Sequence, residues 1–245
     1  MNILWLPSID STNSEAFRRL AELPSGTILA AYEQTAGRGQ RGNTWFTEPG
    51  KNLTFSIVLK FSNGQLAAPQ AHWLNYLMSH VVARFLEDCG VPCQIKWPND
   101  VYVRRRKICG ILIENTLQGP WLDAAVIGVG ININQRTFPQ LSNATSLFCC
   151  TGKEFPLEES LEQVAALFEE ALPALFDAAL RERLFAHYSG SLFQKDIPAR
   201  YRDLLREMEF TGIIEGVEPD GRLCILDQEA GQRRYYQFKE VSYIL

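Results

Sequence analysis

Apolar residues recur with two different periods along the first third of the chain. Residues 3–6, 27–32 and 52–61 are short apolar runs of strand length, and the last run is rich in β-branched and aromatic residues. Over residues 16–23 the apolar positions recur at helical spacing, and residues 71–89 predict a long helix. The pattern therefore predicts alternating strands and helices.

The next strand candidates follow one another closely. They are residues 93–97 with 100–103, then 108–115 and 122–133, and only short turns separate them. Parallel strands need a crossover connection of about a dozen residues or more, whereas a tight turn can join antiparallel strands. The spacing therefore predicts antiparallel hairpins.

Helical periodicity returns over residues 157–184, where Pro173 predicts a break, and a further helix is predicted before Leu205. Together these elements predict an α/β (α+β) fold. Its sheet is mixed and largely antiparallel, and helices pack against it.

The last forty residues change in character. Short strand-like runs are separated by the turn residues Pro219, Asp220 and Gly221 and by Ala230 and Gly231. This pattern is typical of a small β-barrel of four or five strands. We expect a boundary within residues 189–206, between a domain of residues 1–188 and a C-terminal barrel of residues 207–245.

The composition restricts the class of protein. Net charge is −4, from 24 Lys and Arg against 28 Asp and Glu, so a cationic site must be local and a nucleic-acid footprint over the whole surface is disfavoured. The six cysteines form no CxxC pair and predict free thiols, although Cys89 and Cys93 leave a zinc half-site conceivable. The N-terminus lacks the features of a signal peptide, and we expect a cytoplasmic protein with no membrane span.

Three glycines and two arginines fall within "GRGQRG", residues 37–42. Glycine lets backbone N–H groups converge on an anion, and Arg38 and Arg41 supply forked donors that suit phosphate or carboxylate. The stretch is neither a Walker P-loop nor a Rossmann turn. Taken alone, it is equally consistent with a solvated hairpin connection.

The stretch "QIKWPNDVYVRRRKICGILIE", residues 94–114, favours a binding site. It places Lys96 in an otherwise apolar strand and Lys107 at the start of the next one. Most lysines are solvated surface residues, but in a hairpin these two can face the same volume.

With these motifs in view, the sequence resembles the biotin–protein ligases. The segments "DSTN", "EQTAGRGQRG", "KWPND", "KICGILIE" and "VIGVGININ" occur in the order expected of that family, and the resemblance covers essentially the whole chain. It implies a catalytic domain akin to those of class II aminoacyl-tRNA synthetases and lipoate ligases, with an SH3-like barrel at the C-terminus. It also implies an enzyme that makes biotinyl-5′-AMP from biotin and ATP, releases pyrophosphate, and transfers biotin to one lysine of a carrier domain.

The resemblance implies roles for individual residues. Lys107 would bridge the biotin carboxyl group and the α-phosphate, while Arg38 and Lys96 add positive charge, and Asp100 is our candidate for helping the acceptor lysine lose its proton. Magnesium is expected to enter with ATP, without a separate metal site. The residues implied for biotin are Ser11, Thr12, Asn13, Gln34, Gly37, Arg38, Gly39, Gln40, Lys107, Gly110, Leu112 and Gly128. Those implied for ATP are Arg38, Gln40, Arg41, Asn43, Trp45, Lys96, Asn99, Asp100, Lys107, Ile131 and Asn132.

The expected partner is the biotin carboxyl carrier domain of a biotin-dependent carboxylase. Because "DSTN" begins at Asp10, we expect a ligase without an N-terminal DNA-binding domain and no DNA partner. A homodimer and a monomer are equally consistent with the sequence. The alternatives are a lipoate or octanoyl ligase-transferase of the same fold and a non-catalytic sensor of the adenylate.

One residue departs from the family pattern. Many relatives read GRGRxG, whereas Gln40 stands here in place of the second arginine. Because an amide carries no charge, we predict that Gln40→Arg slows the release of biotinyl-AMP. Single-turnover trapping of the released intermediate measures this rate, and an unchanged rate would contradict the prediction.

Overall fold

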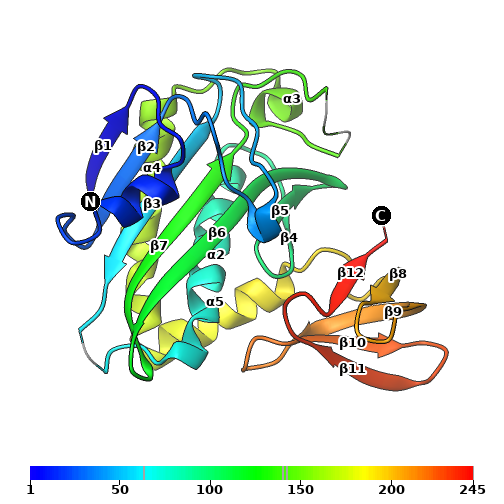
Figure 1. The fold of residues 1–245 in the computed structure, drawn as a ribbon. Helices are drawn as coiled ribbons and strands as arrows, with labels where there is room; N and C mark the ends of the chain where they lie inside the picture. Colours follow the sequence, from blue (N-terminus) through cyan, green and yellow to red (C-terminus); the bar gives the residue numbers. More distant parts are fainter. Residues whose placement is uncertain (63, 140, 142, 245) are drawn as a thin grey trace.

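The larger of two sheets carries most of the chain's buried strands. The computed structural model describes residues 1–62, 64–139, 141 and 143–244. In this part, seven strands pair in the order β1-β2-β3-β7-β6-β5-β4 (Figure 1). Only β1 and β2 run parallel, and the other pairs are antiparallel, as the short turns predicted. The strands are β1 (Asn2–Leu6), β2 (Thr27–Ala31), β3 (Leu53–Lys60), β4 (Gln94–Lys96), β5 (Asp100–Val103), β6 (Arg106–Gln118) and β7 (Trp121–Ile131).

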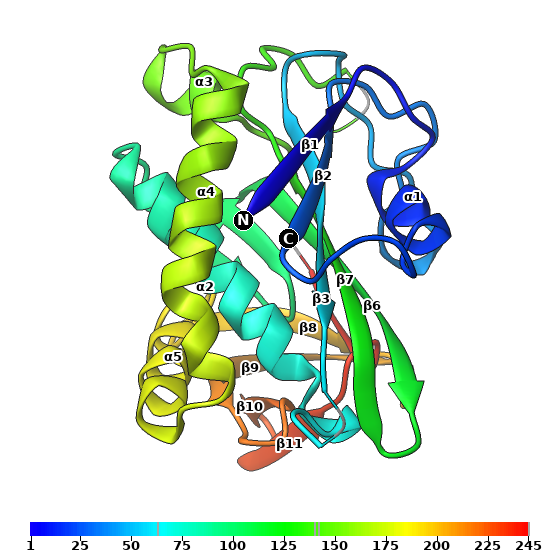
Figure 2. The same cartoon turned by 90° about the vertical axis from the view of Figure 1, so that its left-hand side faces the viewer.

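Helices cover both faces of this sheet. Figure 2 shows α2 and α4 on one side and the short helix α1 on the other. The main core lies under α2 and α4, and a smaller apolar cluster around Ala16, Leu29 and Val126 lies under α1. The α-helices are α1 (Thr12–Arg18), α2 (His72–Asp88), α3 (Leu147–Thr151), α4 (Leu157–Ala171) and α5 (Ala178–Gly190), and short 3-10 turns span Gln40–Gly42, Ala68–Gln70 and Leu172–Leu175. The break predicted at Pro173 falls in the last of these turns.

The first helix is shorter than its apolar spacing predicted. α1 ends at Arg18, and turns bonded from Leu20 to Phe17 and from Leu23 to Arg19 follow it. These turns still bury Leu23, which is 3% exposed. Consecutive turns and a helix both return apolar residues to one side every three or four positions, so the sequence pattern did not distinguish them.

The C-terminal part forms a second sheet of five antiparallel strands in the order β11-β10-β9-β8-β12, which fits the predicted SH3-like barrel. The strands are β8 (Pro198–Asp203), β9 (Met208–Val217), β10 (Leu223–Asp227), β11 (Gln232–Tyr236) and β12 (Val241–Tyr243). The helix predicted before Leu205 was therefore wrong. Tyr201 and Asp203 are buried while Arg200 and Arg202 face solvent, which is the two-residue period of a strand. Because β8 pairs with β9 and β12, we propose to divide the chain between Gly190 and Pro198.

None of the helices within the described ranges combines the length and the apolar character that crossing a bilayer requires.

Helices α2 and α5 meet at a pair of histidines. The Nδ1 atoms of His80 and His187 lie 3.0 Å apart, so one ring must donate and the other accept. Burial lowers the pKa of His80 to about 4, and the nearby charge of His187 and Arg84 acts in the same direction. Burial also lowers the pKa of His187. The folded protein therefore favours the neutral pair.

This pair predicts a pH-dependent stability. As the pH falls from about 6.5 towards about 4, the unfolded chain binds protons that the folded pair resists, so the free energy of unfolding should fall. His80→Leu removes one of these groups and should make that decline shallower. Urea unfolding of wild type and variant across this pH range measures the effect. Parallel curves for the two proteins would contradict it.

Candidate active site

A cavity of about 350 Å³ opens where the first helix, the glycine loop and the two sheets meet. Four cationic side chains, Arg38, Lys96, Lys107 and Lys239, and one carboxylate, Asp100, are among its described lining residues. The cavity is therefore locally positive in an acidic protein, as the composition required. The predicted residues that line it are Ser11, Thr12, Asn13, Gln34, Arg38, Gly39, Gln40, Asn43, Trp45, Lys96, Asn99, Asp100, Lys107, Gly110, Leu112 and Gly128.

The N-terminus of α1 forms a neutral polar end of the cavity. Ser11 is the N-cap residue, but its side chain makes no capping bond. Instead, Gln34 Oε1 accepts from the Thr12 backbone N–H at 2.8 Å and from the Thr12 hydroxyl at 3.1 Å. A side chain from the segment before the glycine loop thus satisfies a free helix donor, which ties the two motifs together.

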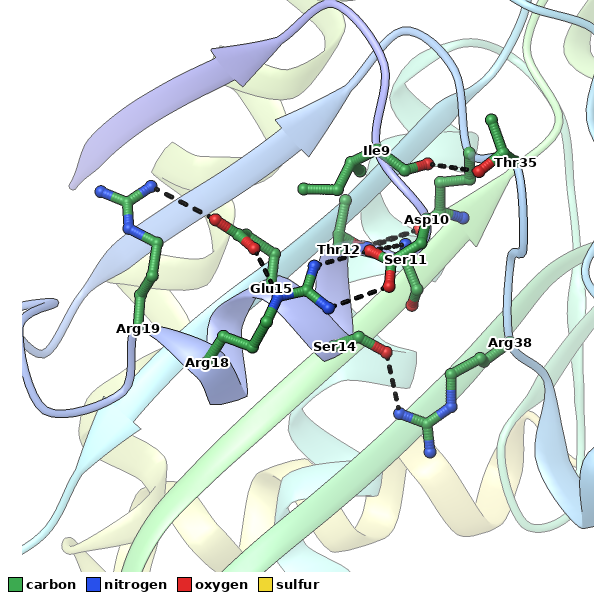
Figure 3. Close-up of polar contacts among 11 residues, drawn as sticks. Ile9, Asp10, Ser11, Thr12, Ser14, Glu15, Arg18, Arg19, Thr35 and Arg38 are labelled. Carbon is green, nitrogen blue, oxygen red and sulfur yellow. Dashed lines mark hydrogen bonds and ion pairs between the residues drawn. The ribbon is translucent and has the colours of Figure 1, made fainter.

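An ion pair anchors this helix from its outer side. Arg18 contacts Asp10 at 2.7 Å and Glu15 at 2.8 Å (Figure 3). The hydrogen bond from Arg18 lowers the pKa of Asp10 to about 2, with help from the Ser11 backbone N–H. Asp10 therefore stays ionised and holds the segment that leads into the cavity.

Asn13 is held at the cavity floor by three partners. Its Oδ1 accepts from the Ser56 hydroxyl at 2.6 Å, and its Nδ2 donates to Glu114 at 2.9 Å and to the Leu112 carbonyl at 3.2 Å. A Cβ at Gly128 would lie 2.1 Å from Asn13 Oδ1. Glycine at this position is therefore required for Asn13 to reach the sheet.

The glycine loop is closed as a small hairpin. The Trp45 N–H donates to the Gly37 carbonyl at 2.9 Å, and the Gly39 N–H donates to Asn43 at 2.7 Å. Arg38 forms an ion pair with Glu114 at 2.7 Å. It also donates to Ser14 at 3.4 Å (Figure 3). Sequence reasoning missed Glu114, which ends the segment KICGILIE but was assigned no role there. The side chain of Arg41 lies outside what the structure describes.

The Trp45 indole lies on two glycines that face each other across strands β6 and β7. Gly110 and Gly130 are register partners, and a Cβ on either would lie within 3.1 Å of the indole ring. Trp45 Nε1 is buried and has no hydrogen-bond partner among the described residues. The ring thus forms an apolar wall between the polar end and the cationic end of the cavity.

The cationic end is centred on Asp100. Lys107 forms an ion pair with Asp100 at 2.7 Å, and Lys96 is the register partner of Asp100 in the β4–β5 hairpin. Lys107 also lies against Gly110, although residues three apart in a regular strand face opposite sides. A register shift in β5–β6, which leaves Ile108 unpaired, turns Lys107 to the side of Gly110. The shift therefore brings Lys107 to Asp100, the residue that Lys96 faces across the β4–β5 pair.

Buried contacts hold the turn between these lysines. The Asn99 side chain donates to the Ile111 carbonyl, and the Ile111 N–H donates to the Asn99 carbonyl at 3.2 Å. Behind the turn, the Tyr188 hydroxyl donates to the Pro98 carbonyl at 2.7 Å. The hydrogen bonds of Asn99 therefore stabilise the turn.

Three predicted residues do not line the cavity. Ile131 is fully buried in the core, and the buried Asn132 side chain donates to the Thr145 carbonyl at 2.9 Å. At Gly37, a Cβ would meet the Trp45 carbonyl oxygen at 2.4 Å, so this glycine closes the hairpin. Conversely, sequence reasoning missed the wall formed by Phe238, Lys239, Val241, Ser242 and Tyr243 at the end of the chain. No motif marks this segment, and only the packing of the second sheet brings it here.

The geometry suits an elongated ligand with a neutral polar head and an acidic end that meets a second anion. Residues 5–132 match the biotin/lipoate A/B protein ligase family. The chain belongs to this family.

Relatives and solved structures narrow the comparison to biotin ligases. The chain is 33% identical to the bifunctional ligase/repressor BirA of Escherichia coli over 93% of this chain and 70% of that protein. It is 32% identical to the biotin–[acetyl-CoA-carboxylase] ligase of Paracoccus denitrificans, covering 95% of it. Its fold matches the biotin protein ligase from Aquifex aeolicus in complex with biotin and ATP with a TM-score of 0.80, at 29% identity and over 98% and 97% of the two chains.

The hydrogen bond behind the turn predicts a difference between two neighbouring tyrosines. Tyr188 and Tyr76 are both buried, with ring centroids 4.0 Å apart, but the Tyr76 hydroxyl has no partner within the described ranges. Tyr188→Phe leaves the Pro98 carbonyl unpaired and should cost about 1–3 kcal/mol of unfolding free energy, whereas Tyr76→Phe should cost close to none. Guanidinium unfolding measures both. Equal losses would show that the hydroxyl of Tyr188 contributes nothing specific.

Proposed function

We propose that this protein is an ATP-dependent biotin–protein ligase that acts through biotinyl-5′-AMP. Biotin and ATP are its substrates, and a biotin carboxyl carrier domain is the acceptor. The observation that carries the proposal is the single cavity that joins a neutral polar network at α1 to a lysine pair around Asp100. A member of this family whose cavity has both the polar end and the cationic end has the groups that the two half-reactions need.

The polar end fits the ureido head of biotin. That head is neutral and has both donors and acceptors, so it requires amide and hydroxyl partners rather than charges. Thr12, Asn13 and Gln34 provide such groups and are already oriented, Thr12 and Gln34 by their mutual bonds and Asn13 by the Ser56 hydroxyl. The apolar rings and valeryl chain would lie along the Trp45 wall and reach the lysines.

The cationic end fits the first chemical step. A carboxylate oxygen of biotin attacks the α-phosphorus of ATP, the bond to the β-phosphate oxygen breaks, and pyrophosphate leaves. Two anions must approach each other, and negative charge develops on the phosphoryl oxygens. Lys107 on β6 and Lys96 on β4, fixed on either side of β5, would stabilise that charge without reorganisation.

In the second step an acceptor lysine amine attacks the acyl carbon of the adenylate, and AMP leaves with the bonding electrons. The attacking amine must lose a proton. We assign this role to Asp100, the carboxylate among the described lining residues, whose exposed fraction of 24% leaves it accessible from the cavity.

Magnesium would enter with the nucleotide. Across the described residues, no three His, Cys, Asp or Glu side chains are grouped so as to hold a metal ion. Triphosphate oxygens would therefore supply most ligands, with Asp100 as the available hard protein donor. A homodimer stays a prediction; β1 is the edge strand of the larger sheet that such an association could use, because Leu192 pairs with Ile95 along the outer edge of β4.

ATP–pyrophosphate exchange, run separately with biotin and with lipoate, tests the proposal. We expect exchange that depends on biotin. Exchange with lipoate alone would assign the site to the other branch of the family, and no exchange with either would favour the sensor alternative.

The same assay tests the lysine assignment. Lys107→Ala should lower kcat/KM by roughly 100- to 1,000-fold, the range seen when one preorganised transition-state donor is removed. Arg106→Ala is a matched control, because Arg106 precedes Lys107 on β6 but is exposed and does not line the cavity. Equal effects of the two changes would contradict the role of Lys107.

A further inference from the structure

The three cations predicted for the site are held in different ways. Arg38 is paired with Glu114 at 2.7 Å and Lys107 with Asp100 at 2.7 Å. Among the described residues, no carboxylate lies within ion-pair distance of Lys96. Its ammonium lies instead over two tyrosine rings.

The two rings come from distant parts of the chain. Lys96 Nζ lies 5.2 Å from the ring centroid of Tyr102 on β5 and 5.0 Å from that of Tyr243 on β12. It is also 3.5 Å from the Tyr102 hydroxyl. One ring therefore belongs to the larger sheet and the other to the last strand of the C-terminal sheet.

The surrounding packing fixes both rings. Phe193 contacts Tyr102 at a centroid distance of 5.3 Å and Tyr243 at 6.2 Å, and Tyr201 contacts Tyr243 at 5.4 Å. The Tyr243 hydroxyl is buried beside the backbone of Trp97 and makes no hydrogen bond of ordinary geometry to the described residues. The contribution that Tyr243 makes at the cavity is therefore its ring.

The rings of Tyr102 and Tyr243, here called the aromatic clamp, differ from a carboxylate partner in their charge. The negative faces of the rings attract an ammonium group and restrict its position, but they carry no net charge. A carboxylate would neutralise the lysine and would repel an incoming phosphate. Burial lowers the pKa of Lys96, and the neighbouring Lys107 acts in the same direction while Asp100 opposes it. Contacts that favour the charged form are therefore useful at this position.

We propose that Tyr102 and Tyr243 are positioning residues that hold the Lys96 ammonium, uncompensated by a carboxylate partner, against the nucleotide phosphates during adenylation. The last strand of the chain is then part of the nucleotide half of the site. This inference rests on the proposed function, because the anion that the clamp prepares for is the triphosphate of ATP.

Substitutions of Tyr243 in the full-length protein test the clamp. Tyr243→Leu removes the ring and should lower kcat/KM for ATP by roughly 2- to 30-fold, the range that corresponds to one cation–π contact. The KM for biotin should change little, because Lys96 lies at the other end of the cavity. Tyr243→Phe keeps the ring and should recover most of the loss. Tyr235→Leu is a matched control in the same sheet, since Arg222 lies 5.2 Å over that ring and Tyr235 does not line the cavity.

A double-mutant cycle separates positioning from general disruption. In a Lys96→Met background, Tyr243→Leu should cost almost nothing further, because the group that it positions is absent. Single-turnover formation of the adenylate from radiolabelled ATP is sensitive enough for these slow variants. If thermal unfolding shows that Tyr243→Leu is not folded, Tyr243→Met replaces it in the same cycle.

The outcomes are distinct. Non-additive losses, with recovery in Tyr243→Phe and a shift confined to ATP, support the clamp. Additive losses in an active wild-type enzyme, or an equal defect in Tyr243→Phe, would overturn the clamp and leave the proposed function intact. A wild-type protein that forms no adenylate from biotin would overturn both.

Discussion

Two lysine side chains are placed around one carboxylate at the centre of the site, and much of the surrounding structure serves to hold that placement. Lys107 is paired with Asp100, and Lys96 stands opposite the same residue in the next strand pair. The two like charges oppose each other, and Lys107 acts to lower the pKa of Lys96, so the arrangement depends on a backbone that is held from several sides. The register shift in β5–β6, the buried Asn99 and the Tyr188 hydroxyl each contribute to that support.

The support extends beyond the larger sheet. The Trp97 indole N–H donates to the Gly221 carbonyl at 3.2 Å, so a turn of the C-terminal sheet contacts the residue next to Lys96. The segment that follows α5 and leads into the second sheet pairs with β4 through Leu192 and Ile95. The second sheet is therefore joined to the strand that carries Lys96 and to the turn that follows it.

Local pattern predicted most of the fold, whereas most candidate site residues were implied by the family resemblance. Strand lengths, tight turns and the break at Pro173 are properties of a few consecutive residues, and they were read correctly. The end of α1 and the identity of residues 198–203 were not, because a series of turns can imitate helical spacing and because the charged residues of β8 mask its alternation. The residues missed at the cavity, Glu114 and Tyr243, share one property: their partners are distant in sequence and depend on how elements pack.

The glycines on β6 and β7 connect the site to a remote part of the sheet. Gly110 faces Gly130 and Leu112 faces Gly128, and this pairing extends, with one register shift at Thr116 and Leu117, to the exposed hairpin tip between Gln118 and Trp121. A slip of one residue would move every side chain of a strand to the opposite face. Adding or removing a residue at that tip would then place β-carbons where Trp45 and Asn13 now lie. A surface turn that contacts no ligand is thereby constrained in length by the shape of the cavity floor.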